Sequence, residues 1–411
     1  MLSLTRRQFG GLVVALGSQT RRLAGAAGIG DTLREGLERR KIPAVAAMVA
    51  TADKTIYVGA FGKRDSASGV DVKSDSIFRI ASMTKAITTT AAMQLVEQGK
   101  LNFDRPVSEH LPELAKLDVL EGFDQAGKPM VRPSRKPIAL KHLMTHTSGF
   151  VYPNWDPVLT RYNQVMKIAN SPGTVAPLTP LRFEPGTRWQ YGTGIDWTGK
   201  LVEKVSGLTL EEYFQRNILQ PLGMKDTSFV LREEKFARLA SSYRRQTDGS
   251  LKEDPRTMPA PPKVYNGGGG LYSTAEDYVR FTQMILRKGR SAGKDQILSP
   301  KSIEMMSANQ IGSVNVEKLT STDHNVSEDV DMHPGAMDKY TFGFLMNPTA
   351  YPGGRSAGSL AWAGVENTFY WIDPRRGICA VIMMQFFPFV DKQALGMLSD
   401  FERAVYANLA S

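Results

Sequence analysis

The 411-residue sequence predicts an α+β protein of the α/β sandwich type: an antiparallel sheet built from both chain ends, flanked by helices, plus an inserted, mainly helical lobe. Two observations predict this fold. Short aliphatic and aromatic runs, typical of strands, lie near both termini, and helical segments alternate with loops between them. We therefore expect a single domain over 28–411. Its sheet-containing lobe covers about 28–80 and 338–411, and its helical lobe covers about 81–337.

The first elements after residue 30 predict the start of the sheet. Asp31 can cap a short helix that runs to residue 40, and Pro43 ends it. Residues 44–50 and 55–61 are two apolar runs joined by a short polar turn, which predicts an antiparallel hairpin.

The middle of the chain is predicted to be helical, and the end returns to strands. Helices are expected at 83–98, 140–145, 195–206, 210–217 and 275–288, several of them ended by glycine. Between 118 and 141 the sequence is rich in Pro, Gly and charge, which predicts loop, and 311–338 predicts a polar surface excursion. Strands are expected at 340–346, 359–363, 367–372 and 377–385, before a closing helix at 391–409.

The formal net charge of +10 is concentrated in part at the N-terminus, where residues 1–30 hold four arginines and no acid. Arg6-Arg7 followed by a short apolar run resembles a twin-arginine export signal over 1–27, which predicts a periplasmic or secreted protein; a cytoplasmic protein with a basic extension is the alternative. Elsewhere both signs of charge are interleaved, so we expect no nucleic-acid partner. We also expect no membrane span, because no apolar stretch approaches ~20 residues.

A serine and a lysine three residues apart carry the first sign of chemistry. Ser82 begins a largely apolar helical segment, and Lys85 lies one turn later on the same helical face. An amine within hydrogen-bonding reach of a hydroxyl can act as its base, particularly where burial favours the neutral amine. A serine N-cap with a surface lysine is the structural alternative for this short motif.

The segment 78–85, with the Leu143-Met144-Thr145-His146-Thr147-Ser148-Gly149 segment and the Gly268-Gly269-Gly270-Leu271-Tyr272-Ser273 segment, resembles the serine β-lactamase and penicillin-binding-protein superfamily. The similarity is greatest to the class C β-lactamase-related esterases, or family VIII carboxylesterases. The resemblance extends from residue 31 to the C-terminus and implies a serine β-lactamase-like fold.

The resemblance also implies roles for residues in two further motifs. Tyr191 takes the place of the family's proton-carrying tyrosine, although Thr193 stands where many relatives have Asn. Trp362 and Gly364 occupy the third motif, where β-lactamases carry a cation, so the resemblance implies a neutral ester as substrate. The backbone N–H groups of Ser82 and Val365 would then form the oxyanion hole.

Other candidate residues have alternative interpretations. Tyr152 and Trp155 could line an acyl pocket or pack under a loop. Ser356 lies in a G-x-S-x-G match, but turn residues precede it where a nucleophile elbow needs a strand. His142 and His146 lack the glutamate of a zinc-binding helix, and Cys379 is the single cysteine. We therefore expect no metal and no cofactor.

The leading functional hypothesis is a serine carboxylesterase that acts on short-to-medium acyl esters, with Ser82 as nucleophile and Lys85 and Tyr191 as general base and acid. An acyltransferase is the alternative, because 191–197 is similar to the Y-G-x-x-x-D-W segment of fungal polyketide acyltransferases in this superfamily. Weak β-lactamase or D-alanyl-peptidase activity and a non-catalytic cell-wall binding protein are further alternatives. The sequence carries no signal of oligomeric state.

Overall fold

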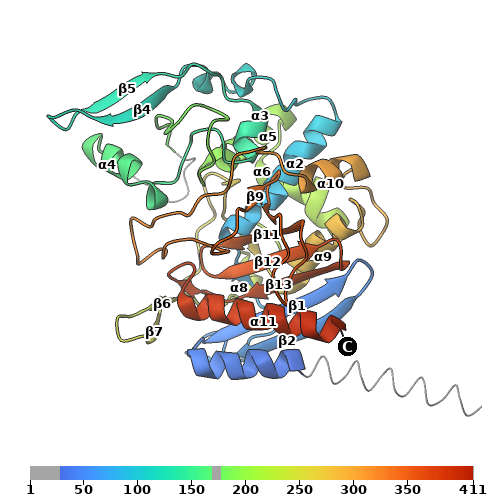
Figure 1. The fold of residues 1–411 in the computed structure, drawn as a ribbon. Helices are drawn as coiled ribbons and strands as arrows, with labels where there is room; N and C mark the ends of the chain where they lie inside the picture. Colours follow the sequence, from blue (N-terminus) through green and yellow to red (C-terminus); the bar gives the residue numbers. More distant parts are fainter. Residues whose placement is uncertain (1–27, 169–176, 411) are drawn as a thin grey trace, which may run out of the picture.

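Strands from the two ends of the chain form one antiparallel sheet in the computed structural model, which describes residues 28–168 and 177–410 (Figure 1). The sheet has seven strands in the order β2-β1-β13-β12-β11-β10-β9. Their bounds are β1 Ala44–Thr51, β2 Thr55–Gly62, β9 Lys339–Tyr340, β10 Leu345–Asn347, β11 Ser359–Gly364, β12 Thr368–Asp373 and β13 Ile378–Met383. The predicted α+β class is confirmed. The expected export signal lies outside the described residues.

Side-chain alternation along the central strands builds two cores, one on each face of the sheet. Val45, Ala47 and Val49 of β1 face the helix at 28–40 and α11 (Lys392–Ala410), whereas Ala46 and Met48 face α2 (Thr84–Glu97) and α9 (Ala275–Leu286). Figure 1 shows α11 running beside the N-terminal helix, and Arg39 and Arg40 of that helix both pair with Asp400 of α11. Two covered faces explain the nearly continuous apolar runs of β1 and β13.

The segment between the two halves of the sheet carries the other helices. These are α3 Leu140–Met144, α4 Pro157–Val165, α5 Gly194–Ser206, α6 Leu210–Phe214, α7 Gln220–Leu222, α8 Glu233–Phe236 and α10 Pro300–Ser307, with short 3-10 turns at Ala81–Met83, Val107–Glu109, Pro112–Leu114 and Pro153–Trp155 and a π turn at Gln215–Leu219. Helix α2 is buried along almost its whole length and ends at Glu97, and Gly99, just beyond its C-cap, has a φ of 68° that suits a glycine. None of the helices in the described ranges has the length and apolarity that a bilayer crossing needs.

Small sheets complete the fold, and one of them corrects an expectation. The region 118–141, predicted as loop, contains a hairpin of β4 Asp118–Phe123 and β5 Pro129–Pro133, which projects from the body in Figure 1. Prolines at both ends of β5 suggested a loop, but an edge strand tolerates them. The remaining short strands are β3 Phe78–Arg79, β6 Tyr243–Arg245, β7 Leu251–Glu253, β8 Tyr272–Ser273 and β14 Phe386–Phe387.

The prediction of one continuous strand over 340–346 is also wrong. Residues 341–344 form a turn between β9 and β10, in which Thr341 N–H donates to the Phe344 carbonyl at 2.8 Å. Gly343 has a φ of 91° and lies against Thr89 of α2, so that a side chain there would collide with it. The close approach of α2 therefore breaks the strand.

Candidate active site

Ser82 lies where the chain leaves strand β3 and enters helix α2. Ala81, the residue before it, has a φ of 41°, a left-handed conformation that is uncommon for a residue other than glycine. Ser82 is the second residue of the 3-10 turn Ala81–Met83, so its N–H has no acceptor within the turn. This sharp bend exposes the Ser82 side chain at the start of the helix, and backbone strain of this kind is typical of functional sites.

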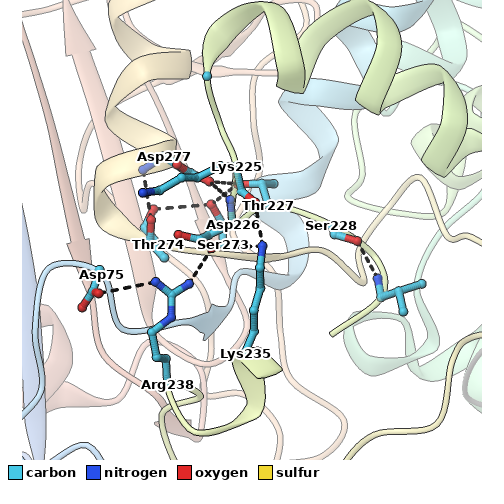
Figure 2. A network of polar contacts seen from close by, with 12 residues as sticks. Asp75, Lys225, Asp226, Thr227, Ser228, Lys235, Arg238, Ser273, Thr274 and Asp277 are labelled. Carbon is cyan, nitrogen blue, oxygen red and sulfur yellow. Dashed lines mark hydrogen bonds and ion pairs between the residues drawn. The ribbon is translucent and has the colours of Figure 1, made fainter. Parts of the chain in front are cut away.

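Figure 2 shows a network of polar contacts around Arg238 and Asp226, and the backbone of Arg238 bonds the segment that leads to Ser82. The residue before β3, Ile77, donates its N–H to the Arg238 carbonyl at 2.8 Å. The Arg238 guanidinium bonds the buried Asp226 at 2.5 Å and Asp75 at 3.4 Å, and Lys235 contacts Asp226 at 3.0 Å. Burial opposes ionisation of Asp226, but the bonds from Arg238 and Lys235 outweigh it and lower the pKa of Asp226.

Ser82, Lys85 and Tyr191 lie together, although Tyr191 is more than 100 residues away in sequence. Lys85 Nζ lies 3.1 Å from Ser82 Oγ, and the Tyr191 hydroxyl donates to Ser82 Oγ at 2.7 Å. Lys85 Nζ also lies 4.9 Å from the centre of the Tyr191 ring. Lys85 is fully buried, which contradicts the alternative of a surface lysine beside a serine cap.

Two residues that the sequence analysis did not place in this cluster extend it inward. Lys85 Nζ donates to the Tyr152 hydroxyl at 3.2 Å, and the Tyr152 hydroxyl donates to Asp196 Oδ2 at 2.7 Å. Asp196 is buried in the first turn of α5, five residues after Tyr191. The sequence signal for Asp196 was its place as the Asp of the Y-G-x-x-x-D-W similarity over 191–197, which carried no assignment of its role.

Strand β11 lies against the turn that carries Ser82. Strand β10 pairs with β11 only as far as Ala361, so Trp362 and Gly364 continue beyond their neighbour on that edge. A Cβ on Gly364 would collide with the Ile80 carbonyl, which shows how closely the two backbones approach. Val365 follows directly and shares one cavity with Ser82.

That cavity has mostly apolar walls, as small-molecule sites commonly do. Trp155 and Trp362 line it beside Ser82 and Tyr191, whereas Tyr152 is not on its wall. Trp155 thus lies on the cavity wall, whereas Tyr152 lies within the polar cluster. Arg355 also reaches the wall, but Glu402 holds its guanidinium through two bonds of 2.9 and 2.6 Å.

The segment 311–338 is irregular, as expected, but it is more than a surface excursion. Leu319, Val330 and Met332 form part of the cavity wall. Leu319 and Val330 bond each other through both backbone N–H groups, at 3.0 and 2.8 Å. The Trp155 indole donates to Ser327 Oγ at 3.2 Å and ties the segment to the opposite wall. Isolated apolar residues in a polar stretch gave no periodic signal for this role.

His146 is packed inside the aromatic cluster behind Tyr191. Its ring lies 4.8 Å from Tyr191, 5.1 Å from Tyr340 and 6.4 Å from Trp362, measured between ring centres. Burial lowers the pKa of His146 well below its usual range, so the imidazole is neutral. His146 therefore supports the Tyr191 ring by packing.

The other candidates have structural roles. His142 Nδ1 accepts the Ala139 N–H at 3.1 Å at the start of α3, and burial lowers the pKa of His142 to about 4. Ser356 lies in the loop between β10 and β11, and Cys379 is buried within β13. No group of three or more His, Cys, Asp or Glu side chains arranged to hold a metal occurs among residues 28–168 and 177–410.

Comparison with known proteins identifies the family to which this chain belongs. The chain matches the β-lactamase family over residues 29–399. The chain belongs to the β-lactamase family. This β-lactamase-family chain is 31% identical over 403 residues to monacolin J acid methylbutanoyltransferase of Aspergillus terreus, which covers 91% of this chain and 94% of that enzyme.

Two further comparisons agree. Lovastatin esterase of Penicillium rubens is 32% identical over 356 residues, or 80% of this chain and 85% of that enzyme. A solved variant of simvastatin synthase from Aspergillus terreus superposes with a TM-score of 0.80 at 31% identity, over 94% of this chain and 98% of that one. This member of the β-lactamase family is therefore a serine enzyme of hydrolysis or acyl transfer.

Proposed function

We propose that the protein is a serine carboxylesterase that hydrolyses short-to-medium acyl esters. One observation carries the proposal: Ser82 Oγ, within 3.1 Å of Lys85 Nζ and 2.7 Å of the Tyr191 hydroxyl, opens onto an apolar cavity. A nucleophile between a base and an acid beside an apolar pocket suits acyl transfer from a neutral ester.

In acylation, Ser82 Oγ attacks the ester carbonyl carbon while its proton passes to Lys85 Nζ. The negative charge on the carbonyl oxygen is met by the N–H groups of Ser82 and Val365. The carbon–oxygen bond to the alcohol then breaks, and Tyr191 gives its phenolic proton to the departing alkoxide. This half-reaction leaves an acyl group on Ser82, a protonated Lys85 and a Tyr191 phenolate beside it.

Deacylation reverses these roles. A water molecule gives its proton to the Tyr191 phenolate as its oxygen attacks the acyl carbon. The bond from that carbon to Ser82 Oγ breaks, and Ser82 takes the proton back from Lys85. Both groups return to their starting states, so the cycle balances without a metal or cofactor.

A neutral substrate fits the charges around the cavity. Trp362 stands where β-lactamases carry a cation, and Arg355 is paired with Glu402. An anionic substrate would find no free positive charge from these residues. We therefore infer low activity on β-lactams and D-alanyl peptides, whose carboxylate needs such a partner.

Acyl transfer to an alcohol is the second candidate. The segment 191–197 and the 31% identity to a methylbutanoyltransferase favour it. The chemistry is the same, with an alcohol in place of water in deacylation. Trp155 and Trp362 on the cavity wall would exclude water and help an alcohol to compete.

One set of assays tests both candidates. Purified protein is assayed on p-nitrophenyl butyrate and on a chromogenic cephalosporin, as wild type, Ser82→Ala and the matched control Ser356→Ala. We expect ester turnover that Ser82→Ala abolishes and Ser356→Ala retains. Ester turnover that survives Ser82→Ala would reject the nucleophile, and faster turnover of the cephalosporin would reject the substrate class. Adding a primary alcohol and measuring butyrate ester against free butyrate separates transfer from hydrolysis.

A further inference from the structure

Asp196 and Tyr152 form a polar branch behind Lys85 that the catalytic scheme does not yet use. The Asp196 carboxyl group is buried, which raises its pKa, and it accepts hydrogen bonds from Tyr152, at 2.7 Å, and from the Asn266 side chain, which favour the carboxylate form. A Cβ on Gly268 would collide with this carboxylate. The glycine run 267–270 therefore lets the backbone approach Asp196 and Lys85 together.

The position of the proton on Tyr152 follows from its two neighbours. Burial and the Asp196 carboxylate raise the pKa of Tyr152 well above its usual value of 10, so the phenol keeps its proton. That proton points to Asp196, the acceptor at 2.7 Å. The Tyr152 oxygen can then only accept a hydrogen bond from Lys85, which lies 3.2 Å away.

Lys85 Nζ has three polar neighbours, and two of them can only accept. The Gly268 carbonyl accepts one N–H of Lys85, and the Tyr152 oxygen accepts another. A neutral lysine amine has two N–H bonds and one lone pair. With both N–H bonds engaged, the lone pair faces the third neighbour, Ser82 Oγ, at 3.1 Å.

We propose, resting on the serine mechanism above, that Asp196 and Tyr152 are positioning residues that aim the lone pair of Lys85 at the Ser82 hydroxyl. The hydrogen bonds then run in one direction: Tyr191 donates to Ser82, Ser82 donates to Lys85, Lys85 donates to Tyr152, and Tyr152 donates to Asp196. Proton transfer from Ser82 to Lys85 needs no reorientation in this arrangement.

The substitution Asp196→Asn should reverse this order at almost constant volume. The amide N–H of asparagine can donate to the Tyr152 oxygen, and the Tyr152 proton can then turn toward Lys85. Lys85 would accept that proton with its lone pair and lose it as a base for Ser82. The substitution Tyr152→Phe removes the hydroxyl that links Lys85 to Asp196. One N–H of Lys85 then lacks its acceptor, so the amine can rotate and its lone pair can turn away from Ser82.

The test measures kcat/KM on p-nitrophenyl butyrate and the rate of fluorophosphonate labelling, both of which report acylation of Ser82. The variants are Asp196→Asn, Tyr152→Phe, their double variant and the control Tyr340→Phe. Tyr340 belongs to the same aromatic cluster, but its buried hydroxyl has no hydrogen-bond partner among the described residues. Thermal unfolding of each variant reports folding.

We expect each single variant to lose about 10–100-fold in both rates, which is less than the full ~10²–10⁴-fold that a general base contributes, because Lys85 itself remains in place. The double variant should lose no more than the worse single variant, because both substitutions break one relay. Tyr340→Phe should keep the wild-type rates. Losses that multiply in the double variant, or wild-type rates in Tyr152→Phe, would overturn the proposal. If Asp196→Asn does not fold, the rates of Tyr152→Phe by themselves decide whether the proposal holds.

This outcome is separate from that of the proposed function. If Ser82→Ala keeps esterase activity, the serine mechanism fails, whatever the relay variants do. If Ser82→Ala is inactive and fluorophosphonate labels the wild type, but the relay variants keep full rates, only the positioning role fails.

Discussion

The contact between Gly364 and Ile80 allows a sharp test of how the site is built. Gly364 ends strand β11, and Ile80 lies two residues before Ser82. A Cβ at position 364 would lie well inside 3.0 Å of the Ile80 carbonyl oxygen, closer than real Cβ atoms come to such an atom. The Ile80 carbonyl accepts the Met83 N–H at 3.0 Å, so it cannot withdraw without disturbing the turn that carries Ser82.

The substitution Gly364→Ala should therefore push β11 and the Ser82 turn apart. A displacement on the order of 1 Å in catalytic geometry costs about 10²-fold in rate, so we expect kcat on p-nitrophenyl butyrate to fall by about that factor. Overpacking of this kind costs about 1–3 kcal/mol of stability, which should lower Tm by several degrees.

The control is Gly269→Ala, in the glycine run near the same turn. A Cβ there would come no closer than 3.8 Å to Ala81, an ordinary contact, so rates and Tm should stay near wild type. Steady-state kinetics and thermal unfolding of both variants test whether catalysis needs the close approach of β11 to the Ser82 turn. Wild-type kcat in folded Gly364→Ala would show that the close approach is not needed for catalysis.

Three further substitutions test other parts of the structure. Asp226→Asn removes the carboxylate whose folded pKa is lowered by Arg238 and Lys235. Its stability contribution is present above the unfolded pKa of about 4 and is lost as pH falls through the folded value. Breaking a fully buried ion pair costs about 3–5 kcal/mol, and solvent screens this partly exposed one, so the variant should lose about 1–3 kcal/mol in urea unfolding at pH 7 and less near pH 3; an equal loss at both pH values would contradict this. Phe389→Ala enlarges the cavity, and each methylene added to the acyl chain should gain about fourfold in relative kcat/KM; an unchanged chain-length profile would place the acyl group elsewhere. Trp155→Phe removes the hydrogen bond to Ser327, which contributes about 1 kcal/mol to folding, so Tm should fall by a few degrees. Because this bond also holds the segment that forms the cavity wall, KM should rise several-fold, and an unchanged KM would show that substrate binding does not depend on the contact.

The pair Ser82 and Lys85 was predictable because one helical turn brings residues three apart to the same face. The strands β1, β2, β11, β12 and β13 were predictable for a similar reason, since each is a local run of aliphatic and aromatic residues. The resemblance added Tyr191, whose contact with Ser82 spans 109 residues. No local pattern carries information over that distance.

The structure decided how distant segments meet. Asp196 and Tyr152 reach Lys85 only because α5, α2 and the loop after α3 pack together, and each of the three segments taken alone predicts no such contact. The segment 311–338 had no periodic pattern, yet it forms a cavity wall through Leu319 and Val330. Gly343, likewise, interrupts a strand because a neighbouring helix lies against it.

The sequence by itself determined the α+β class, the strands at both chain ends and the residue types available for acyl transfer, because these depend on short-range periodicity and motif spacing. Only the tertiary structure decided which way Lys85 is aimed, which side chains line the cavity and how closely β11 approaches the Ser82 turn. Those properties depend on the separation of segments far apart in the chain to within a few tenths of an ångström, and packing of the whole molecule sets that separation.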